Sequence, residues 1–260
     1  MKISVCCPSY HRPRVETLDY LPFVRVYVDN KEFDEYVKNN PQETDIIAVP
    51  DGVQGNLCRI RNYILDSEFN SGIDVVCLID DDMKGLYCWE KKERRKLPAD
   101  EWQGFLQKYS LICKEWGAFF WGVNVNQDYQ SYRENNPFST VSYIGGPFQV
   151  HLKESGLRYD ERFPLKEDYD MTLQHLNTYR KALRVNKFFY IVKQSEQKGG
   201  CATMRNLEVE KGQLEALQKK WGTKIVKNDP RKNRSNNMVK TKGKNYIDYN
   251  PVIHVPIKGV

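Results

Sequence analysis

The sequence lacks several features that would place it in other classes of protein. It has no run of about 18 apolar residues, so we expect no membrane-spanning helix. The apolar run within residues 1–10, MKISVCCPSY, is too short for a secretory signal, and we expect it to form the first strand. No two cysteines have CxxC spacing, and the four histidines show no zinc-ligand spacing. These absences argue against a membrane protein, a secreted protein and a zinc-binding module.

Seven cysteines are present, an odd number, and several lie in apolar stretches, among them Cys6, Cys77 and Cys113. Buried, reduced thiols are typical of cytosolic proteins, so we expect a cytoplasmic location. The adjacent Cys6 and Cys7 could be redox-active. Because successive side chains of a strand point to opposite faces, burial of at least one of them is the stronger expectation.

The positive charge of the chain is concentrated at its carboxyl end. The chain has 260 residues, 40% of them hydrophobic and 28% charged, as expected of a globular protein, and its net charge is +6. Residues 211–260 hold twelve Lys and Arg and three acids, a net charge of +9, which leaves −3 for residues 1–210. Such asymmetry predicts a polyanionic partner for the basic segment 219–244. A lysine-rich surface that only keeps the protein in solution is the alternative.

Strand and helix patterns alternate over the first 80 residues. The apolar runs predict strands at 2–7, 24–28, 45–50 and 74–79, and helices at 31–40 and 55–69. This βαβαβ order, with short connections, predicts a parallel sheet with helices on both faces. In such sheets ligands bind at the carboxyl ends of the strands.

The pattern is less regular after residue 80. Residues 89–97, WEKKERRKL, are predicted to be a charged loop or the start of a helix. Gly145 and Gly146 interrupt a predicted strand at 140–152 and are expected to bend or open it. The other predicted elements are helices at 100–117, 168–183 and 207–222 and strands at 118–125 and 186–194.

Three consecutive aspartates, Asp80, Asp81 and Asp82, follow the predicted strand 74–79. Side chains at i and i+2 point the same way at a strand end, so Asp80 and Asp82 could hold one cation between them. Carboxylate oxygens suit Mg²⁺ or Mn²⁺, and such ions stabilise the charge that develops on a diphosphate leaving group. The alternative is a solvated acidic turn.

A second acidic pair, Glu167 and Asp168, lies at the start of the predicted helix in the stretch LKEDYDM. Neighbouring carboxylates raise the pKa of a carboxyl group and make it a better general base. Simple capping of the helix is the alternative, since the helix dipole also favours acids at this position.

Taken together, these motifs resemble those of GT-A glycosyltransferases. ISVCCPSYHRPR resembles the first strand of that family, and Asp29 ends the second strand, as the base-binding acid of the family does. GNLCRIRNYIL is similar to the G-x-x-x-A-R-N helix of the family, and LIDDDM is similar to its DxD motif. GGPF…KEDYDM is similar to its Gly-Gly strand followed by the ED motif. The resemblance covers residues 1 to 180. It implies an α/β fold of the GT-A, Rossmann-like type, with a mixed sheet flanked by helices. We expect a core at 1–206 and a basic carboxyl-terminal helix and extension at 207–260.

The resemblance also implies roles for individual residues. The enzyme would transfer the sugar of a UDP-sugar to an acceptor hydroxyl, with Mn²⁺ or Mg²⁺ as cofactor. Asp168, or else Glu167, would deprotonate that hydroxyl. Asp82 and Asp80 would hold the metal. Many such enzymes take a third metal contact from a carboxyl-terminal His or acid, for which Glu196 and His254 are the candidates here, although no H-x-x-G-G motif is present. The residues expected to bind the nucleotide-sugar are Pro8, Ser9, Tyr10, Arg12, Asp29, Arg61, Asp80 and Asp81.

The acceptor is inferred from the charge of the carboxyl end together with the resemblance. The compact size and loose motifs look like those of the TET-associated phage DNA glycosyltransferases, which implies a bacteriophage enzyme acting on double-stranded DNA that carries 5-hydroxymethylcytosine or 5-hydroxymethyluracil. The basic segment would contact phosphates, and the modified base would leave the stack. Trp121, Tyr143 and Phe148 are candidates to stack on it, although aromatic residues in strands more often belong to the core. One carboxylate base predicts inversion at the anomeric carbon, and we expect a monomer.

Other functions remain open at this point. The acceptor could be a saccharide, lipid or protein, with the basic tail near an anionic membrane. A metal-dependent nucleotidyltransferase should have a glycine-rich phosphate loop near the first strand, and PSYHRPR is not one. A DNA-binding module without enzymatic activity would use the acids only structurally.

Overall fold

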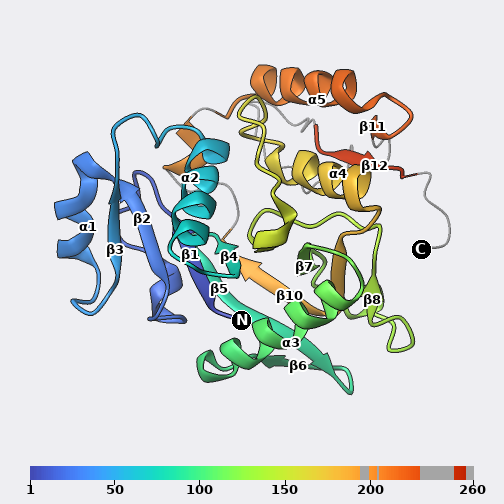
Figure 1. Cartoon of the computed structure of the whole chain (residues 1–260), viewed down its shortest axis with the longest axis horizontal. Helices are drawn as coiled ribbons and strands as arrows, with labels where there is room; N and C mark the ends of the chain where they lie inside the picture. The colour runs from blue at the N-terminus through green and yellow to red at the C-terminus, as the bar shows by residue number, and fades with distance from the viewer. Residues whose placement is uncertain (194–198, 204, 229–248, 256–260) are drawn as a thin grey trace, which may run out of the picture.

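A mixed β-sheet forms the centre of the molecule in the computed structural model, which describes residues 1–193, 199–203, 205–228 and 249–255. In this part of the chain the sheet has ten strands, in the order β3, β2, β1, β4, β9, β7, β10, β5 and β6, with β8 beside β10 (Figure 1). The strands are β1 (Ile3–Pro8), β2 (Arg25–Asp29), β3 (Ile46–Val49), β4 (Val75–Ile79), β5 (Met83–Glu90), β6 (Glu93–Lys96), β7 (Phe120–Asn124), β8 (Phe138–Ser139), β9 (Phe148–Leu152) and β10 (Leu183–Val192). The first four are parallel to one another, and β9 and β5 run against their neighbours. The predicted mixed α/β sheet is confirmed.

Helices cover both faces of the sheet. They are α1 (Phe33–Asn39), α2 (Leu57–Asn70), α3 (Trp102–Glu115), α4 (Glu167–Tyr179) and α5 (Leu207–Trp221). Val5 and Cys7 of β1 pack into the core beneath α1 and α3, whereas Cys6 packs into the core beneath α2 and α4. Because both faces are covered, β1 and β4 are continuous apolar runs, and Cys6 and Cys7 are both fully buried. All seven cysteines are unpaired, as predicted, and six of them are buried.

The prediction of a charged loop or helix start at 89–97 was wrong. The segment forms a β-hairpin, in which β5 and β6 are joined by Lys91 and Lys92 with φ of 49° and 71°. Both residues adopt the left-handed conformation that a two-residue type I′ turn requires. All four residues of β6 are exposed at the edge of the sheet, so no alternation of apolar side chains marks the strand. Charged edge strands of this kind resist pairing with other chains.

The predicted strand at 140–152 begins only at Phe148, after the two glycines. Residues 140–147 are irregular because their backbone passes close to other elements. A Cβ at Gly145 would lie 2.4 Å from the Tyr190 hydroxyl, and one at Gly146 would lie 3.2 Å from a Glu167 carboxylate oxygen. The predicted helix 168–183 ends earlier, at Tyr179, because Arg180 adopts a left-handed conformation and Leu183 already belongs to β10.

A third layer lies outside α4, at the end of the molecule away from α1 (Figure 1). Leu214 and Leu217 of α5 pack with Tyr169 and Leu173 of α4, together with the small sheet of β11 (Val226–Asn228) and β12 (Pro251–Ile253). The boundary predicted at residue 206 stays a prediction. Within the described residues, no helix is both long enough and apolar enough to cross a membrane.

Buried ions join α5 to the start of α4. Lys166, with no exposed side-chain surface, pairs with Glu210, which is 3% exposed, and donates to Asn250 Oδ1 at 2.9 Å. Lys220 and the indole nitrogen of Trp221 reach Asp170 at 2.7 and 2.8 Å. These contacts fix the first turn of α4 from its outer side.

We expect Lys166→Met to lower the free energy of unfolding by about 3 kcal/mol, because it removes one of the two cations of the buried Glu210 carboxylate, which keeps Arg205 at 3.0 Å. Removing both charges in Lys166→Met with Glu210→Leu should recover most of this loss. Urea denaturation followed by circular dichroism measures both variants. The control is Lys211→Met, which breaks an exposed pair with Glu215 on the same helix and should cost less than about 0.5 kcal/mol. Equal effects of Lys166→Met and Lys211→Met would contradict the structural importance of the buried pair.

Candidate active site

The predicted site residues gather at one edge of the sheet. Asp80, Asp81 and Asp82 follow β4, the loop with Ser9 and Arg12 follows β1, and Asp29 ends β2. Because β9 and β5 run in the opposite direction, their first residues lie at the same edge, which brings Gly146 and Met83 to the aspartates. Crevices at the carboxyl ends of parallel strands are the usual binding sites in such folds.

Asp81 faces the loop after β1. Its carboxylate accepts hydrogen bonds from the Ser9 hydroxyl at 2.6 Å and the Arg12 guanidinium at 2.7 Å. The Ser9 hydroxyl is also 2.9 Å from that of Tyr36. The structure therefore brings three predicted nucleotide-binding residues, Ser9, Arg12 and Asp81, into direct contact, with Asp81 almost fully buried.

Asp80 is joined to the start of α4 through Arg61. The Arg61 guanidinium is 1% exposed and lies 3.3 Å from Asp80 and 3.1 Å from Glu167. It also donates to Gln149 Oε1 at 3.1 Å and to the Gly146 carbonyl at 3.0 Å. Arg61 thus fixes the two acidic motifs relative to each other, and its predicted contact with the nucleotide stays a prediction. Desolvation raises the pKa of Asp80 and so does Asp81, while Arg61 opposes the rise.

Asp82 differs from its two neighbours because its carboxylate has no hydrogen-bond donor within the part of the chain that the structure describes. Its side chain is 7% exposed. Burial, followed by repulsion from Asp80 and Asp81, raises the pKa of Asp82 to about 8. A proton or a cation would stabilise a carboxylate with these neighbours.

Thr17 supports the backbone of the aspartates. Its amide donates to the Asp81 carbonyl at 3.1 Å and its hydroxyl to the Asp80 carbonyl at 2.6 Å, while the amide of Met83 donates to the same hydroxyl at 2.9 Å. Thr17 was not predicted, because a single threonine in the short 3₁₀ helix Glu16–Asp19, 63 residues before Asp80, carries no motif. Gln149 was missed as well, although a polar side chain in the apolar stretch FQVHL is a signal that a buried charge needs a partner.

Asp168 and Glu167 have different surroundings at the start of α4. Asp168 is half-buried and accepts hydrogen bonds from the Tyr143 hydroxyl and, at 3.0 Å, from the Gly146 amide. Glu167 is 7% exposed and engaged with Arg61. Burial and the adjacent Asp168 raise the pKa of Glu167 to about 8, against the opposing effect of Arg61. Of the two, Asp168 is the carboxylate that an acceptor could reach.

The site holds more negative than positive charge. Among the residues that the structure describes, the cations nearest to Asp80, Asp81, Asp82, Glu167 and Asp168 are the guanidinium groups of Arg12 and Arg61. Within the described residues, no three His, Cys, Asp or Glu side chains are arranged to hold a metal by themselves. A divalent ion fits the excess charge and the unpartnered Asp82, provided that the ligand supplies further oxygens.

The two candidates for a third metal contact are not placed there by the structure. His254 is exposed after β12, where its amide donates to the Ile225 carbonyl at 2.7 Å. Glu196 lies outside the described residues, as does most of the basic segment 219–244, from residue 229 onward.

The remaining nucleotide-side residues lie along the loops after β1 and β2. Pro8 ends β1, and the Tyr10 ring lies 3.8 Å from that of His11, between centroids. The Asp29 carboxylate accepts a hydrogen bond from the Lys31 amide at 2.9 Å. Their roles in nucleotide binding stay predictions.

Trp121 and Phe148 are not available to stack on a flipped base. Both are fully buried in the core beneath α3, which confirms the alternative that aromatic residues in these strands belong to the core. They lie in strands whose two faces are covered, where aromatic side chains fill the core. Tyr143 is partly exposed and stacks on Tyr169, with ring centroids 4.3 Å apart, while its hydroxyl holds Asp168.

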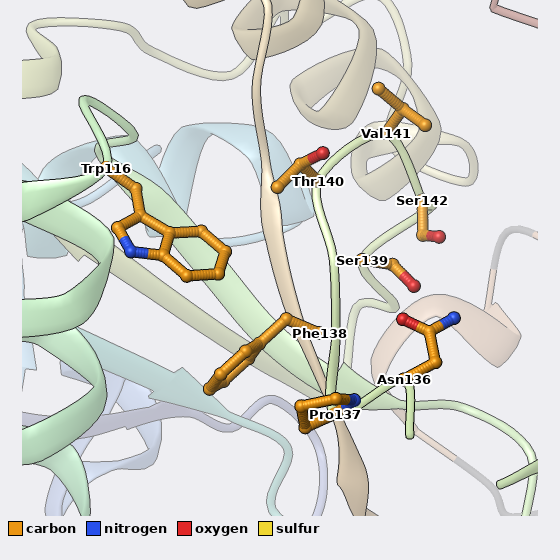
Figure 2. Close-up of a pocket in the computed structure, with 8 residues that line it drawn as sticks. All are labelled: Trp116, Asn136, Pro137, Phe138, Ser139, Thr140, Val141 and Ser142. Atoms are coloured by element: carbon orange, nitrogen blue, oxygen red, sulfur yellow. The ribbon is translucent and has the colours of Figure 1, made fainter. Parts of the chain in front are cut away.

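A large open cavity lies elsewhere on the molecule. Figure 2 shows its lining by Trp116 and residues 136–142, and its volume is about 520 Å³. Ser139 pairs with Arg184 and Val141 with Ala182, near the start of β10. Since β10 runs parallel to β7 and β4, the cavity is at the opposite edge of the sheet from the aspartates and takes no part in the candidate site.

Comparison with known proteins gives a family and a fold. The family model for TET-Associated Glycosyltransferase matches residues 19–200, more than half of the chain. No protein of curated function matches the sequence significantly.

Two similar solved structures are of glucosyl-3-phosphoglycerate synthase from Mycobacterium tuberculosis. One, in complex with Mn²⁺, uridine diphosphate and glucosyl-3-phosphoglycerate, is 12% identical with a TM-score of 0.51, and the match covers 88% of this chain and 84% of that one. The other, with Mg²⁺ and uridine diphosphate, is 11% identical with a TM-score of 0.51 and coverages of 87% and 82%. S. aureus TarS 1–349 is 14% identical with a TM-score of 0.48, over 84% of this chain but only 66% of that one. The predicted GT-A fold is confirmed.

Proposed function

The chain belongs to the TET-associated glycosyltransferase family, and from this premise we propose that it transfers a sugar from a UDP-sugar to 5-hydroxymethylcytosine or 5-hydroxymethyluracil in DNA. The family is described as a glycosyltransferase associated with TET. The resemblance described above implies that the acceptor is a hydroxymethylated pyrimidine. The net charge of +9 over residues 211–260 suits a DNA substrate. Membership of a glycosyltransferase family argues against a nucleotidyltransferase and against a DNA-binding module without activity.

The observation that carries the proposal is the acidic cluster at the carboxyl edge of the sheet. Asp82 and Asp80 would hold Mn²⁺ or Mg²⁺, with the diphosphate of the donor as the other ligand. Similar structures in complex with uridine diphosphate and either ion support this choice of donor and metal. The ion, when bound, would neutralise the charge of the diphosphate leaving group. Ser9, Arg12 and Asp81 would form the nucleotide side of the site.

Asp168 is the proposed general base. Its carboxylate takes the proton of the hydroxymethyl group as the hydroxyl oxygen bonds to the anomeric carbon of the sugar. The bond from that carbon to the diphosphate oxygen breaks, and UDP leaves with the electron pair. The Tyr143 hydroxyl and the Gly146 amide orient Asp168 for this step. A single base opposite the leaving group gives a product with inverted anomeric configuration.

The biological setting proposed here is the hypermodification of bacteriophage DNA in the cytoplasm. The unpaired state of all seven cysteines supports a reducing compartment. We expect the enzyme to act as a monomer.

The deciding experiment uses the full chain with Mn²⁺, a panel of UDP-sugars and a duplex with hydroxymethylcytosine or hydroxymethyluracil. Mass spectrometry of the digested nucleosides should show a hydroxymethylpyrimidine heavier by one sugar residue. Duplexes with cytosine or thymine at the same position are the controls. Transfer to saccharide, lipid or protein acceptors, with none to either modified duplex, would overturn the proposed acceptor.

A further inference from the structure

The β5–β6 hairpin carries a cluster of cations without carboxylate partners. Lys91, Lys92, Arg94 and Lys96 form no ion pair with any residue that the structure describes, whereas Arg95 pairs with Glu90 and Glu101. Some arginines elsewhere are paired with acids, as in Arg14–Asp19, Arg59–Glu161 and Arg158–Asp66, whereas the exposed Arg133 and Arg180 also form no ion pair with a described residue. What distinguishes the hairpin is that it gathers four such cations within residues 91–96, beside a single acid, Glu93, which concentrates positive potential there.

Aromatic rings lie beneath these cations. The Arg94 guanidinium lies 5.0 Å from the centroid of the Tyr87 ring, and the Lys96 ammonium lies 4.0 Å from that of Tyr20 and 6.0 Å from that of Tyr87. Tyr87 and Trp89 in turn stack on Phe189 of β10, with centroids 5.9 and 5.4 Å apart. The rings hold the two cationic side chains extended over the sheet, which reduces the entropy lost when they bind an anion. Basic side chains interleaved with aromatic rings are typical of nucleic-acid-binding surfaces.

The hairpin is connected directly to the candidate site. Strand β5 begins at Met83, the residue after Asp82, and runs out to the lower right in Figure 1. Tyr87 lies about 13 Å along the strand from Met83, and Lys91 about 26 Å. These lengths correspond to about 4 and 8 base pairs of duplex DNA. A duplex with one base at the aspartates and its axis along β5 therefore has phosphates that can reach the hairpin.

We propose that the β5–β6 hairpin binds the phosphates of the acceptor duplex about 4 to 8 base pairs from the base that receives the sugar. The inference rests on the proposed function, since it takes DNA as the acceptor, and it adds a binding surface outside the carboxyl-terminal segment. Protection of the sheet edge by charge is the competing explanation for the same residues.

The hairpin can be neutralised without disturbing its turn. Lys91→Asn and Lys92→Gly create the Asn-Gly pair that two-residue loops with two positive φ angles favour. Arg94→Gln removes a third charge and keeps most of the side chain. The matched control, Lys2→Gln with Lys38→Gln and Lys108→Gln, removes three charges from exposed positions away from the hairpin. Thermal unfolding checks that both triple variants are folded.

Fluorescence anisotropy with an unmodified 30-base-pair duplex, at several salt concentrations, tests the surface separately from sugar transfer. The hairpin variant should bind on the order of 10- to 100-fold more weakly, and its slope of log affinity against log salt should be smaller by about 2 to 3. The control should match the wild type. Equal slopes and affinities for all three proteins would overturn the role of the hairpin and leave edge protection as its explanation. Weaker binding by the hairpin variant, with no sugar transfer by the wild type to modified DNA, would instead overturn the proposed acceptor.

Discussion

Asp82→Asn is expected to lower the rate of sugar transfer by about 1,000-fold or more, because a metal that stabilises the leaving group contributes several kcal/mol and each 1.4 kcal/mol is tenfold in rate. The substitution keeps the shape of the side chain and removes its charge. Asp82 is buried and has no hydrogen-bond donor among the described residues, so no bond in the apo protein is lost. The folded protein should therefore be as stable as the wild type, or more so, without added metal.

Metal binding can be measured separately from activity. Mn²⁺ with UDP should raise the unfolding temperature of the wild type and leave that of Asp82→Asn nearly unchanged, because only a protein that holds the ion gains stability from it. Asp34→Asn, on the exposed face of α1, is the control and should behave as the wild type. An Asp82→Asn enzyme that keeps more than about a tenth of its rate and the same thermal shift would remove Asp82 from the metal site.

Asp168→Asn should reduce kcat by about 100- to 10,000-fold with little change in KM, since a general base acts in the transition state and contributes this much to the rate. The amide oxygen of asparagine can still accept from the Tyr143 hydroxyl and the Gly146 amide. One bond, from the Tyr169 amide at 2.8 Å, is lost. Steady-state kinetics with saturating donor and modified duplex measures both constants.

Glu167→Gln is the matched comparison for the base assignment. Its amide oxygen keeps an acceptor for Arg61, so we expect a fall in kcat of less than about 10-fold from small shifts of Arg61 and Asp80. The structure separates the two acids clearly, with Glu167 directed to a buried guanidinium and Asp168 half-exposed. A larger loss for Glu167→Gln than for Asp168→Asn would transfer the role of base to Glu167.

Local pattern was enough to predict the first half of the fold. The strands with two covered faces are continuous apolar runs, and the acids that follow β4 and begin α4 are visible as short motifs. The hairpin of β5 and β6 was missed because its outer strand buries no side chain and so has no apolar period. Trp121 and Phe148, which were also considered as stacking partners, belong to the core because both faces of their strands are covered.

The contacts within the site are long-range in sequence, and no local pattern encodes them. Arg61 and Glu167 are 106 residues apart, and Ser9 and Asp81 are 72 apart. Sequence motifs identified each of these residues separately. The pairing of acids with arginines depends on the order of the strands in the sheet, which the motifs do not give. The assignment of Arg61 to a link between two acidic motifs required the structure.

The buried pair of Lys166 and Glu210 has a consequence for how such enzymes diversify. Lys166 immediately precedes the two acids of α4, and its partner belongs to the helix that leads into the basic carboxyl end. The carboxyl-terminal region is therefore not an interchangeable module. A recombination that imported a foreign tail without an acid for Lys166 would leave a buried charge unpaired beside Glu167 and Asp168, so we expect the tail and α4 to be inherited together.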